Sequence, residues 1–292
     1  MGVAAALGLA PEAIARAIGI AGSLASGIIE YLADGSSTKR LHAGAAAQSG
    51  IRAALLADGG FTGPATVLEG QHGFYKAFAP SRAPDFAPLL DRLGENWLLE
   101  TIAFKPYACG TMTQPFIDCA IELARSGIRA EEIAAMVCEV GEGTVHRLWE
   151  PLKLKQAPPN GYAAKFSTPY CIAVGFIDGK AGFEQFTDKR VTDPALRELA
   201  GTVSYVIDPN NEYPRNFTGH IRVTLKDGRV VEVRKPHMRG GAHEPLSQSD
   251  IMAKFYDNAR YGGWPRGKAA ALVEAVDRIA AGGAAELAIA RG

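Results

Sequence analysis

Two short stretches of the sequence place cations and polar side chains together in a way that could bind an acidic substrate. In residues 36–44, Lys39, Arg40 and His42 stand just ahead of a run of small residues that is typical of a helix. Free N–H groups at a helix N-terminus and nearby cations both attract carboxylates, so this stretch predicts a carboxylate pocket. The alternative is that Lys39 and Arg40 are solvated loop charges.

The second stretch is residues 104–114, where Lys105 ends an apolar run and a proline follows it. Cys109, Gly110 and Thr111 form a small turn after the lysine. A lysine held in this way could present an ammonium group to an anion, or act as an acid or base if burial lowers its pKa. The alternative is a strand-ending lysine in water, with Cys109 as a small core residue.

Tyr170 is a third candidate for chemistry. Pro169 fits only the start of a helix, which would place Tyr170 in the first turn. Its phenol could donate a proton to a substrate. The alternative, which is commoner in proteins, is a buried aromatic ring with a hydrogen-bonded hydroxyl.

Other kinds of site find no support in the sequence. There is no phosphate-binding loop, no dinucleotide-binding glycine pattern after a strand, no G-x-S-x-G and no H-E-x-x-H. The six histidines are scattered singly and the four cysteines form no C-x-x-C pair, so we expect neither a metal site nor a disulfide framework. A reducing cytosol is the expected location.

Charge and composition exclude further classes. The 292 residues contain 31 Lys+Arg and 31 Asp+Glu, so the net charge is zero. Nucleic-acid and anionic-membrane binders need a basic excess, so neither partner is expected. Residues 17–29 are too short to cross a bilayer, and no basic residue precedes the apolar start, which disfavours a secretory signal. With 47% hydrophobic and 21% charged residues, we expect a cytoplasmic globular protein.

The elements that position these residues are helical at both ends of the chain and mixed in the middle. Apolar spacing predicts helices over residues 11–32, 44–56, 74–78, 114–126 and about 163–176, with Gly127 closing the fourth. Strand-like runs cover residues 134–140, 203–207, 220–225 and 229–234, and Asp227-Gly228 predicts a hairpin between the last two. Helices return over residues 247–259, where Ser247 and Asp250 resemble a capping box, and over about 268–289.

This order predicts an α+β fold: a discontinuous, mostly helical domain with an inserted smaller α+β lid that contains an antiparallel sheet. We expect residues 1–100 to belong to the helical domain and residues 101–242 to the lid. Residues 243–292 would then return to the helical domain.

Five ordered motifs across nearly the whole chain resemble the MmgE/PrpD family, which includes 2-methylcitrate dehydratases, cis-aconitate decarboxylases and iminodisuccinate epimerases. The resemblance implies small di- or tricarboxylate substrates, no metal or organic cofactor, an active site between the two domains and a homodimer. The motifs are residues 19–27, residues 38–50, Lys105-Pro106-Tyr107, Ser167-Thr168-Pro169-Tyr170, and Pro245-Leu246-Ser247 with Lys254-Phe255.

The resemblance also implies roles for single residues. It makes Lys105, Tyr170 and His42 catalytic candidates. It supports the placement of the substrate-binding candidates at Lys39, Arg40, Cys109, Gly110 and Thr111.

The chain departs from the family pattern in two places. Many relatives place a histidine a few residues after the lid lysine, where this chain has residues 108–111 without one. Relatives also carry a further helical segment ahead of the position of Met1, with an aspartate and histidines of the pocket. We therefore expect a truncated frame or one half of a split enzyme that needs a separate N-terminal half.

The implied reaction is elimination of water from a tricarboxylate, as in a 2-methylcitrate dehydratase. A base removes the proton next to one carboxylate, an acid protonates the leaving hydroxyl, and cations hold the carboxylates. Decarboxylation of the cis-aconitate type and epimerisation of the iminodisuccinate type are alternatives within the family. A non-catalytic fragment or interaction subunit is the alternative outside it.

Overall fold

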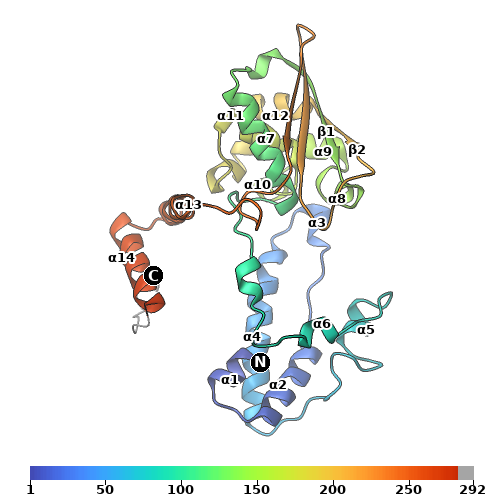
Figure 1. The fold of residues 1–292 in the computed structure, drawn as a ribbon, viewed down its shortest axis with the longest axis vertical. Coiled ribbons are helices and arrows are strands. Elements are labelled where there is room, and N and C mark those ends of the chain that lie inside the picture. Colours follow the sequence, from blue (N-terminus) through green and yellow to red (C-terminus); the bar gives the residue numbers. More distant parts are fainter. Residues whose placement is uncertain (282–292) are drawn as a thin grey trace. The chain divides into compact units, whose positions relative to one another are not determined.

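The computed structural model describes residues 1–281 and divides them into two units (Figure 1). The first comprises Met1–Trp97, and the second begins at Leu98. No helix among the residues described is both long and apolar enough to cross a membrane.

The first unit is made only of helices and loops. Its helices are α1 (Gly2–Ala6), α2 (Pro11–Ser23), α3 (Tyr31–Asp34), α4 (Thr38–Asp58), α5 (Phe74–Phe78) and α6 (Ala87–Leu90). α2 and α4 pack around a core in which alanines such as Ala17, Ala54 and Ala57 predominate. A Cβ added at Gly19 would lie 2.6 Å from the carbonyl oxygen of Pro64, so only glycine permits this close approach.

Two helix boundaries in this unit differ from the prediction. The helix expected over residues 11–32 ends at Ser23, and Gly27 has φ of +109°, a conformation that a helix excludes. α4 begins at Thr38 instead of residue 44. Lys39, Arg40 and His42 therefore belong to the first turns of the helix and do not precede it.

The second unit contains a four-stranded sheet of β1 (Ile133–Val140), β2 (Val203–Ile207), β3 (Gly219–Leu225) and β4 (Val230–Lys235), in the order β2-β1-β3-β4. β3 pairs antiparallel with β1 and with β4, and Asp227-Gly228 lies in the predicted hairpin. β1 and β2 pair in parallel, with Cys138 opposite Tyr205. The sheet is thus mixed: the predicted antiparallel pairing holds for β1, β3 and β4, and the parallel pair of β1 with β2 was not predicted.

The parallel pair follows from the long connection between β1 and β2. Residues 141–202 form α8 (Glu142–Leu148), α9 (Leu152–Gln156), α10 (Gly161–Ala164), α11 (Thr168–Asp178) and α12 (Pro194–Gly201), with two short 3₁₀ turns, Phe183–Phe186 and Arg190–Thr192. Such a helical crossover can return the chain in the same direction beside the strand that it left. A local hairpin signal carries no information about this pairing.

α7 (Gln114–Arg125) connects the sheet to the rest of the core. The thiol of Cys119 donates to the carbonyl oxygen of Val233 in β4 at 3.7 Å, and Gly219 of β3 lies against Pro115. α7 also packs against α11, in which every residue from Thr168 to Phe176 is buried. Three further 3₁₀ turns complete the segments around α7: Leu98–Thr101, Thr111–Thr113 and Ala130–Glu132.

The last described helices are α13 (Gln248–Tyr261) and α14 (Arg266–Ala280). The predicted capping box is present, because Ser247 accepts from the Asp250 amide and the Asp250 carboxylate accepts from the Ser247 amide. The remainder of the helix predicted to residue 289 lies outside the described residues. α13 contacts the 3₁₀ turn Phe183–Phe186 through the stacked Phe183 and Tyr261 rings, whose centroids are 5.2 Å apart.

The α+β class is therefore confirmed. The discontinuous helical domain, with boundaries near residues 100 and 242, stays a prediction.

Candidate active site

The N-terminal ends of α7 and α11 lie at the same end of the second unit. Thr113, just before α7, lies close enough to Cys171 of α11 to lower the pKa of its thiol against the larger effect of burial, and Ile117 of α7 lies against Gly175. Both contacts advance by four residues on each segment, so the two helices run parallel. The amide of Gly110 also donates to the carbonyl oxygen of Lys165 at 2.8 Å, which joins the two segments that precede the helices.

Several lysines gather at this end. Lys105 Nζ donates to the carbonyl oxygen of Cys109 at 3.4 Å, and Lys254 Nζ of α13 donates to the carbonyl oxygen of Lys105. Lys165 Nζ lies 5.1 Å from the centroid of the Phe183 ring. Lys155 Nζ donates to the carbonyl oxygens of Arg147 and Phe166, at 2.7 and 2.9 Å. We call Lys105, Lys165 and Lys254 the lysine cluster.

The pKa shifts of two lysines at this end reflect burial and, for Lys254, a neighbouring like charge. Burial and then the charge of Lys105 lower the pKa of Lys254. Burial also lowers the pKa of Lys155, against an opposing effect of Cys171. No carboxylate is among the groups that shift either pKa. Parallel helix N-termini add further positive potential, so this end favours the binding of an anion.

Cys109 lies at the centre of this region and is buried, with its Sγ 3.1 Å from Thr113 Oγ1. Burial by itself would raise the pKa of the thiol. Hydrogen bonds with Cys171 and Thr113, followed by the charges of Lys105 and Lys165, outweigh that effect and lower it. The neighbouring Cys171 thiol has a raised pKa because it is buried. Of the pair, Cys109 is therefore the one that ionises more easily.

Lys105, Cys109, Gly110 and Thr111 lie in one short segment that leads into the 3₁₀ turn Thr111–Thr113, and their role in substrate binding stays a prediction. Gly110 and Thr111 are partly buried, while Lys105 is exposed.

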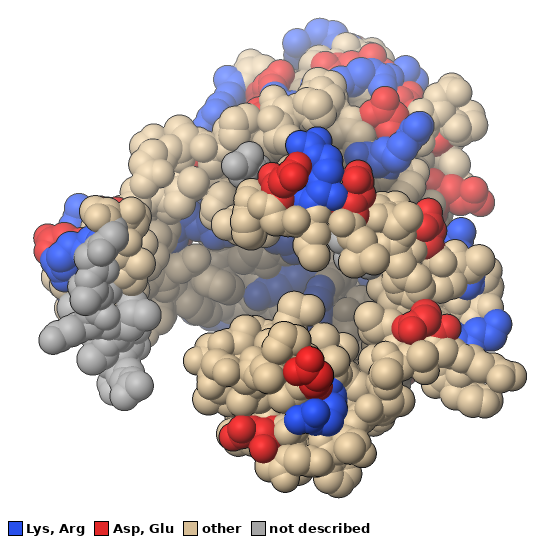
Figure 2. Space-filling model, turned by 60° about the horizontal axis from the view of Figure 1, so that its bottom comes forward, with Lys and Arg blue, Asp and Glu red and all other residues tan. Residues whose placement is uncertain are grey.

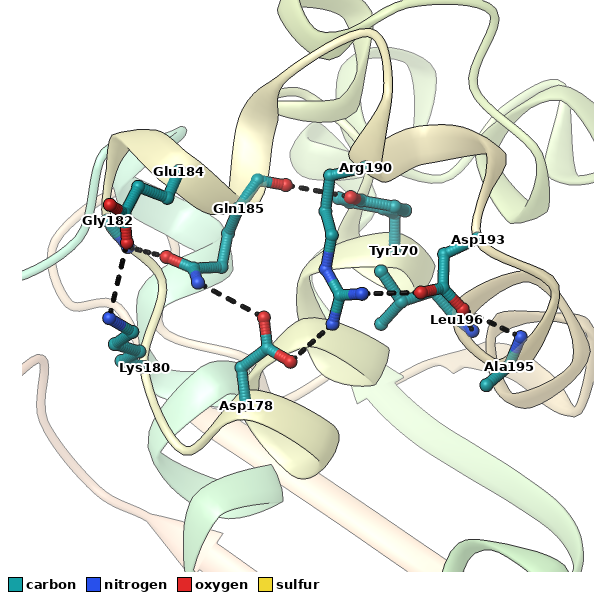
Figure 3. Close-up of polar contacts among 10 residues, drawn as sticks. All are labelled: Tyr170, Asp178, Lys180, Gly182, Glu184, Gln185, Arg190, Asp193, Ala195 and Leu196. Atoms are coloured by element: carbon teal, nitrogen blue, oxygen red, sulfur yellow. Dashed lines mark hydrogen bonds and ion pairs between the residues drawn. The ribbon is translucent and has the colours of Figure 1, made fainter.

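Tyr170 lies in the core of the same unit (Figure 3). Its hydroxyl donates to the carbonyl oxygen of Gln185 at 2.7 Å, and burial raises its pKa. The Gln185 amide donates to Asp178, which also pairs with Arg190 at 2.5 Å. This geometry is that of a buried, hydrogen-bonded tyrosine. A catalytic role for Tyr170 stays a prediction.

The carboxylate pocket predicted for residues 36–44 lies in the first unit. Lys39 and Arg40 are exposed and His42 is partly buried. The His42 and Tyr31 ring centroids are 5.9 Å apart, and Lys39 Nζ lies 5.9 Å from the Tyr31 ring. The first turn of α4 contains no acidic residue. Cations at a helix N-terminus repel the helix dipole, so a bound anion would stabilise this arrangement. That this stretch and the lysine cluster bind the same substrate stays a prediction.

Lys165 and Lys254 are not among the site residues predicted from the sequence. Lys254 was noted only as part of a motif, and no local pattern relates it to Lys105, 149 residues away. No group of three or more histidine, cysteine, aspartate or glutamate side chains in residues 1–281 is arranged to hold a metal ion.

Comparison with known proteins places the chain in a family. The model of the MmgE/PrpD C-terminal domain matches residues 107–278, and the model of the MmgE/PrpD N-terminal domain matches residues 1–87. The chain belongs to the MmgE/PrpD family. Both family domains are therefore represented in it.

Curated relatives have two activities in their names. Cis-aconitate decarboxylase of Mus musculus is 32% identical over 259 residues, which cover 87% of this chain and 51% of that protein. The human cis-aconitate decarboxylase is 31% identical over 260 residues, with 87% and 52% covered. A 2-methylcitrate dehydratase of Cupriavidus necator is 25% identical over 244 residues, with 79% and 49% covered. The chain spans about half the length of these relatives.

Proposed function

We propose that this MmgE/PrpD chain acts as a lyase on a small tricarboxylate and that the lysine cluster binds carboxylates of the substrate. The lysine cluster at the N-termini of two parallel helices carries the proposal, because Lys105 and Lys254 both direct their ammonium groups onto main-chain carbonyl oxygens of one short loop. The two activities named among the relatives, on cis-aconitate and on 2-methylcitrate, both concern tricarboxylates.

The proposed chemistry places negative charge where the lysines can stabilise it. In decarboxylation, the bond to one carboxylate breaks, CO₂ leaves, and a proton adds to the carbon that retains the electron pair. In dehydration, the α-proton leaves first and the hydroxyl departs as water. Both routes pass through negative charge shared with a carboxylate, and fixed ammonium groups stabilise such charge more in the transition state than in the substrate.

Decarboxylation deserves the first assay, although the sequence analysis placed dehydration first. Relatives named as cis-aconitate decarboxylases are 28–32% identical over 85–87% of this chain. Those named as 2-methylcitrate dehydratases are 24–25% identical over 79–82%. Dehydration is therefore the second candidate, and epimerisation of a substituted dicarboxylate is the third.

The test is proton NMR of cis-aconitate and of 2-methylcitrate incubated with the purified chain in D₂O. Decarboxylation yields a dicarboxylate and CO₂, dehydration yields a new double bond, and epimerisation of iminodisuccinate in a third sample introduces deuterium without net product. We expect Lys105→Ala to lower kcat/KM on the order of 10²–10³-fold, the effect of losing one transition-state donor. The control is Lys180→Ala, whose side chain is 55% exposed in a weak surface ion pair.

The outcomes of this test distinguish the hypotheses about function. Turnover that Lys105→Ala and Lys180→Ala affect equally would remove the lysine cluster from the mechanism. A folded chain that turns over none of the substrates would favour the non-catalytic reading or the need for a separate N-terminal half. Coexpression with a neighbouring reading frame separates these two, because only a split enzyme forms a stoichiometric active complex.

A further inference from the structure

Lys254 is the one member of the lysine cluster that comes from the C-terminal helices. It lies in the second turn of α13, is partly buried, and directs its ammonium group onto the main chain of the Lys105 loop. The titratable groups that shift its pKa are Lys105 and Cys109. The ion pairs of α13 with other segments, Arg239 with Asp250 at 3.6 Å and Arg260 with Glu184 at 2.9 Å, involve other turns of the helix.

Two ammonium groups of one sign are thus held on the same short loop. Lys105 Nζ donates to the carbonyl oxygen of Cys109, and Lys254 Nζ donates to that of Lys105, so both are anchored by neutral main-chain acceptors. The partial burial of Lys254 and the nearby charge of Lys105 both disfavour the charged form of Lys254. A carboxylate has two oxygens and can accept from two ammonium groups at once, which would remove this repulsion.

We propose that Lys254 and Lys105 form a two-lysine clamp for one carboxylate of the substrate, so that helix α13 supplies a binding residue to the site. This inference rests on the proposed function, since it assigns one carboxylate of the tricarboxylate to a specific pair of side chains. Lys254 is then a binding residue and not only a tether between α13 and the Lys105 loop.

The experiment measures the affinity of the whole chain for propane-1,2,3-tricarboxylate, a tricarboxylate with no hydroxyl group or double bond, by titration calorimetry. We expect Lys254→Gln to weaken binding roughly 10- to 100-fold, the usual effect of losing one hydrogen bond between charged groups. Lys254→Arg should keep most of the affinity. Lys180→Gln is the matched control on an exposed lysine, and its affinity should stay within about twofold of the unmodified chain.

The two Lys254 variants show whether Lys254 binds the carboxylate or only tethers α13 to the Lys105 loop. Glutamine can still donate a hydrogen bond to the Lys105 carbonyl oxygen, whereas arginine also keeps the charge. If Lys254→Gln binds as tightly as the unmodified chain, the clamp is wrong. Thermal unfolding of each variant identifies one that fails to fold, and the decision then rests on the folded variant and the proton measurement described next.

Proton uptake gives a readout that a structural tether would not affect. Because the pKa of Lys254 is lowered in the free protein, a bound carboxylate raises it again, and the protein takes up protons as it binds. The binding heat should therefore depend on the ionisation enthalpy of the buffer, and affinity should fall as pH rises. Lys254→Arg should abolish this dependence, since arginine stays charged.

The failure of this inference can be distinguished from the failure of the proposed function. Absence of tricarboxylate binding by the unmodified chain would contradict the proposed function together with the clamp. Binding that neither Lys254 variant changes, with the same proton uptake in Lys254→Arg, would overturn the clamp alone.

Discussion

At the scale of single residues, Gln114 is the clearest departure from ordinary packing. It begins α7, is fully buried, and neither its amide oxygen nor its amide nitrogen has a hydrogen-bond partner among the described residues. Thr168, the first residue of α11, is also fully buried with an unpartnered hydroxyl. A buried polar group without a partner costs about 1–3 kcal/mol, so Gln114 and Thr168 each lower the free energy of unfolding. Such costs concentrate where proteins bind and react.

Replacement of Gln114 by an apolar side chain of similar size should therefore stabilise the fold. We expect Gln114→Met to raise the free energy of unfolding by about 1 kcal/mol or more, measured by thermal or urea unfolding. Gln156 is the control, since it is also buried but donates to the carbonyl oxygens of Gly201 and Val203 at 3.2 and 2.8 Å. Gln156→Met should destabilise. Equal losses of stability in both variants would show that Gln114 has a partner, such as a buried water.

At the scale of elements, the close approach of α7 and α11 aligns their N-termini. A Cβ at Gly175 would lie 3.0 Å from both the Cγ2 and the carbonyl oxygen of Ile117, so the pair depends on a glycine at the contact. Because the lysine cluster lies at one end of this pair, a change in helix spacing would move the cations relative to each other.

Gly175→Val should force the helices apart. Overpacking of this kind costs about 1–3 kcal/mol, and we expect a lower melting temperature together with weaker tricarboxylate binding. Gly201 ends α12, and a Cβ there meets nothing within 4 Å, so Gly201→Val should change stability by less than about 0.5 kcal/mol. A Gly175→Val protein as stable as the control would show that the helix contact is not tight.

At the scale of the whole molecule, the first unit presents an unusually apolar surface. Residues 1–97 contain 15 of the 62 charged residues of the chain, and Figure 2 shows mostly uncharged residues over this part. On α4, Leu41, Ile51 and Leu55 are 64%, 47% and 56% exposed. At 100° per residue they span about 80° of the helix, on the side opposite its buried alanines. Apolar stripes of this kind favour association.

We therefore expect the chain to self-associate through this face of α4, in agreement with the homodimer that the family resemblance implies. Light scattering during gel filtration should find more than one copy per particle at micromolar concentration. An Ile51→Glu, Leu55→Glu double variant should shift the protein toward the monomer without loss of helicity. Monomers at high concentration in both proteins would contradict this prediction and favour another partner for the face.

The sequence by itself determined what depends on neighbouring residues. Strand-like runs and the Asp227-Gly228 turn predicted the four described strands to within one or two residues, since strand and hairpin signals are local. The order of motifs determined the family, and the capping box at Ser247 determined the start of α13. Lys39 and Lys105 are site candidates from the sequence because each stands in a distinctive local pattern.

Only the tertiary structure decided what depends on distant parts of the chain. The parallel pairing of β1 with β2 follows from a crossover of five helices, and the approach of Lys254 to Lys105 joins residues 149 positions apart. The burial of Tyr170 and of the unpartnered Gln114 depends on the packing of α7 and α11. Spacing along a sequence specifies which way a side chain points on its own helix or strand. Loop closure and packing decide which distant charged groups and core residues the side chain contacts, and no local pattern encodes them.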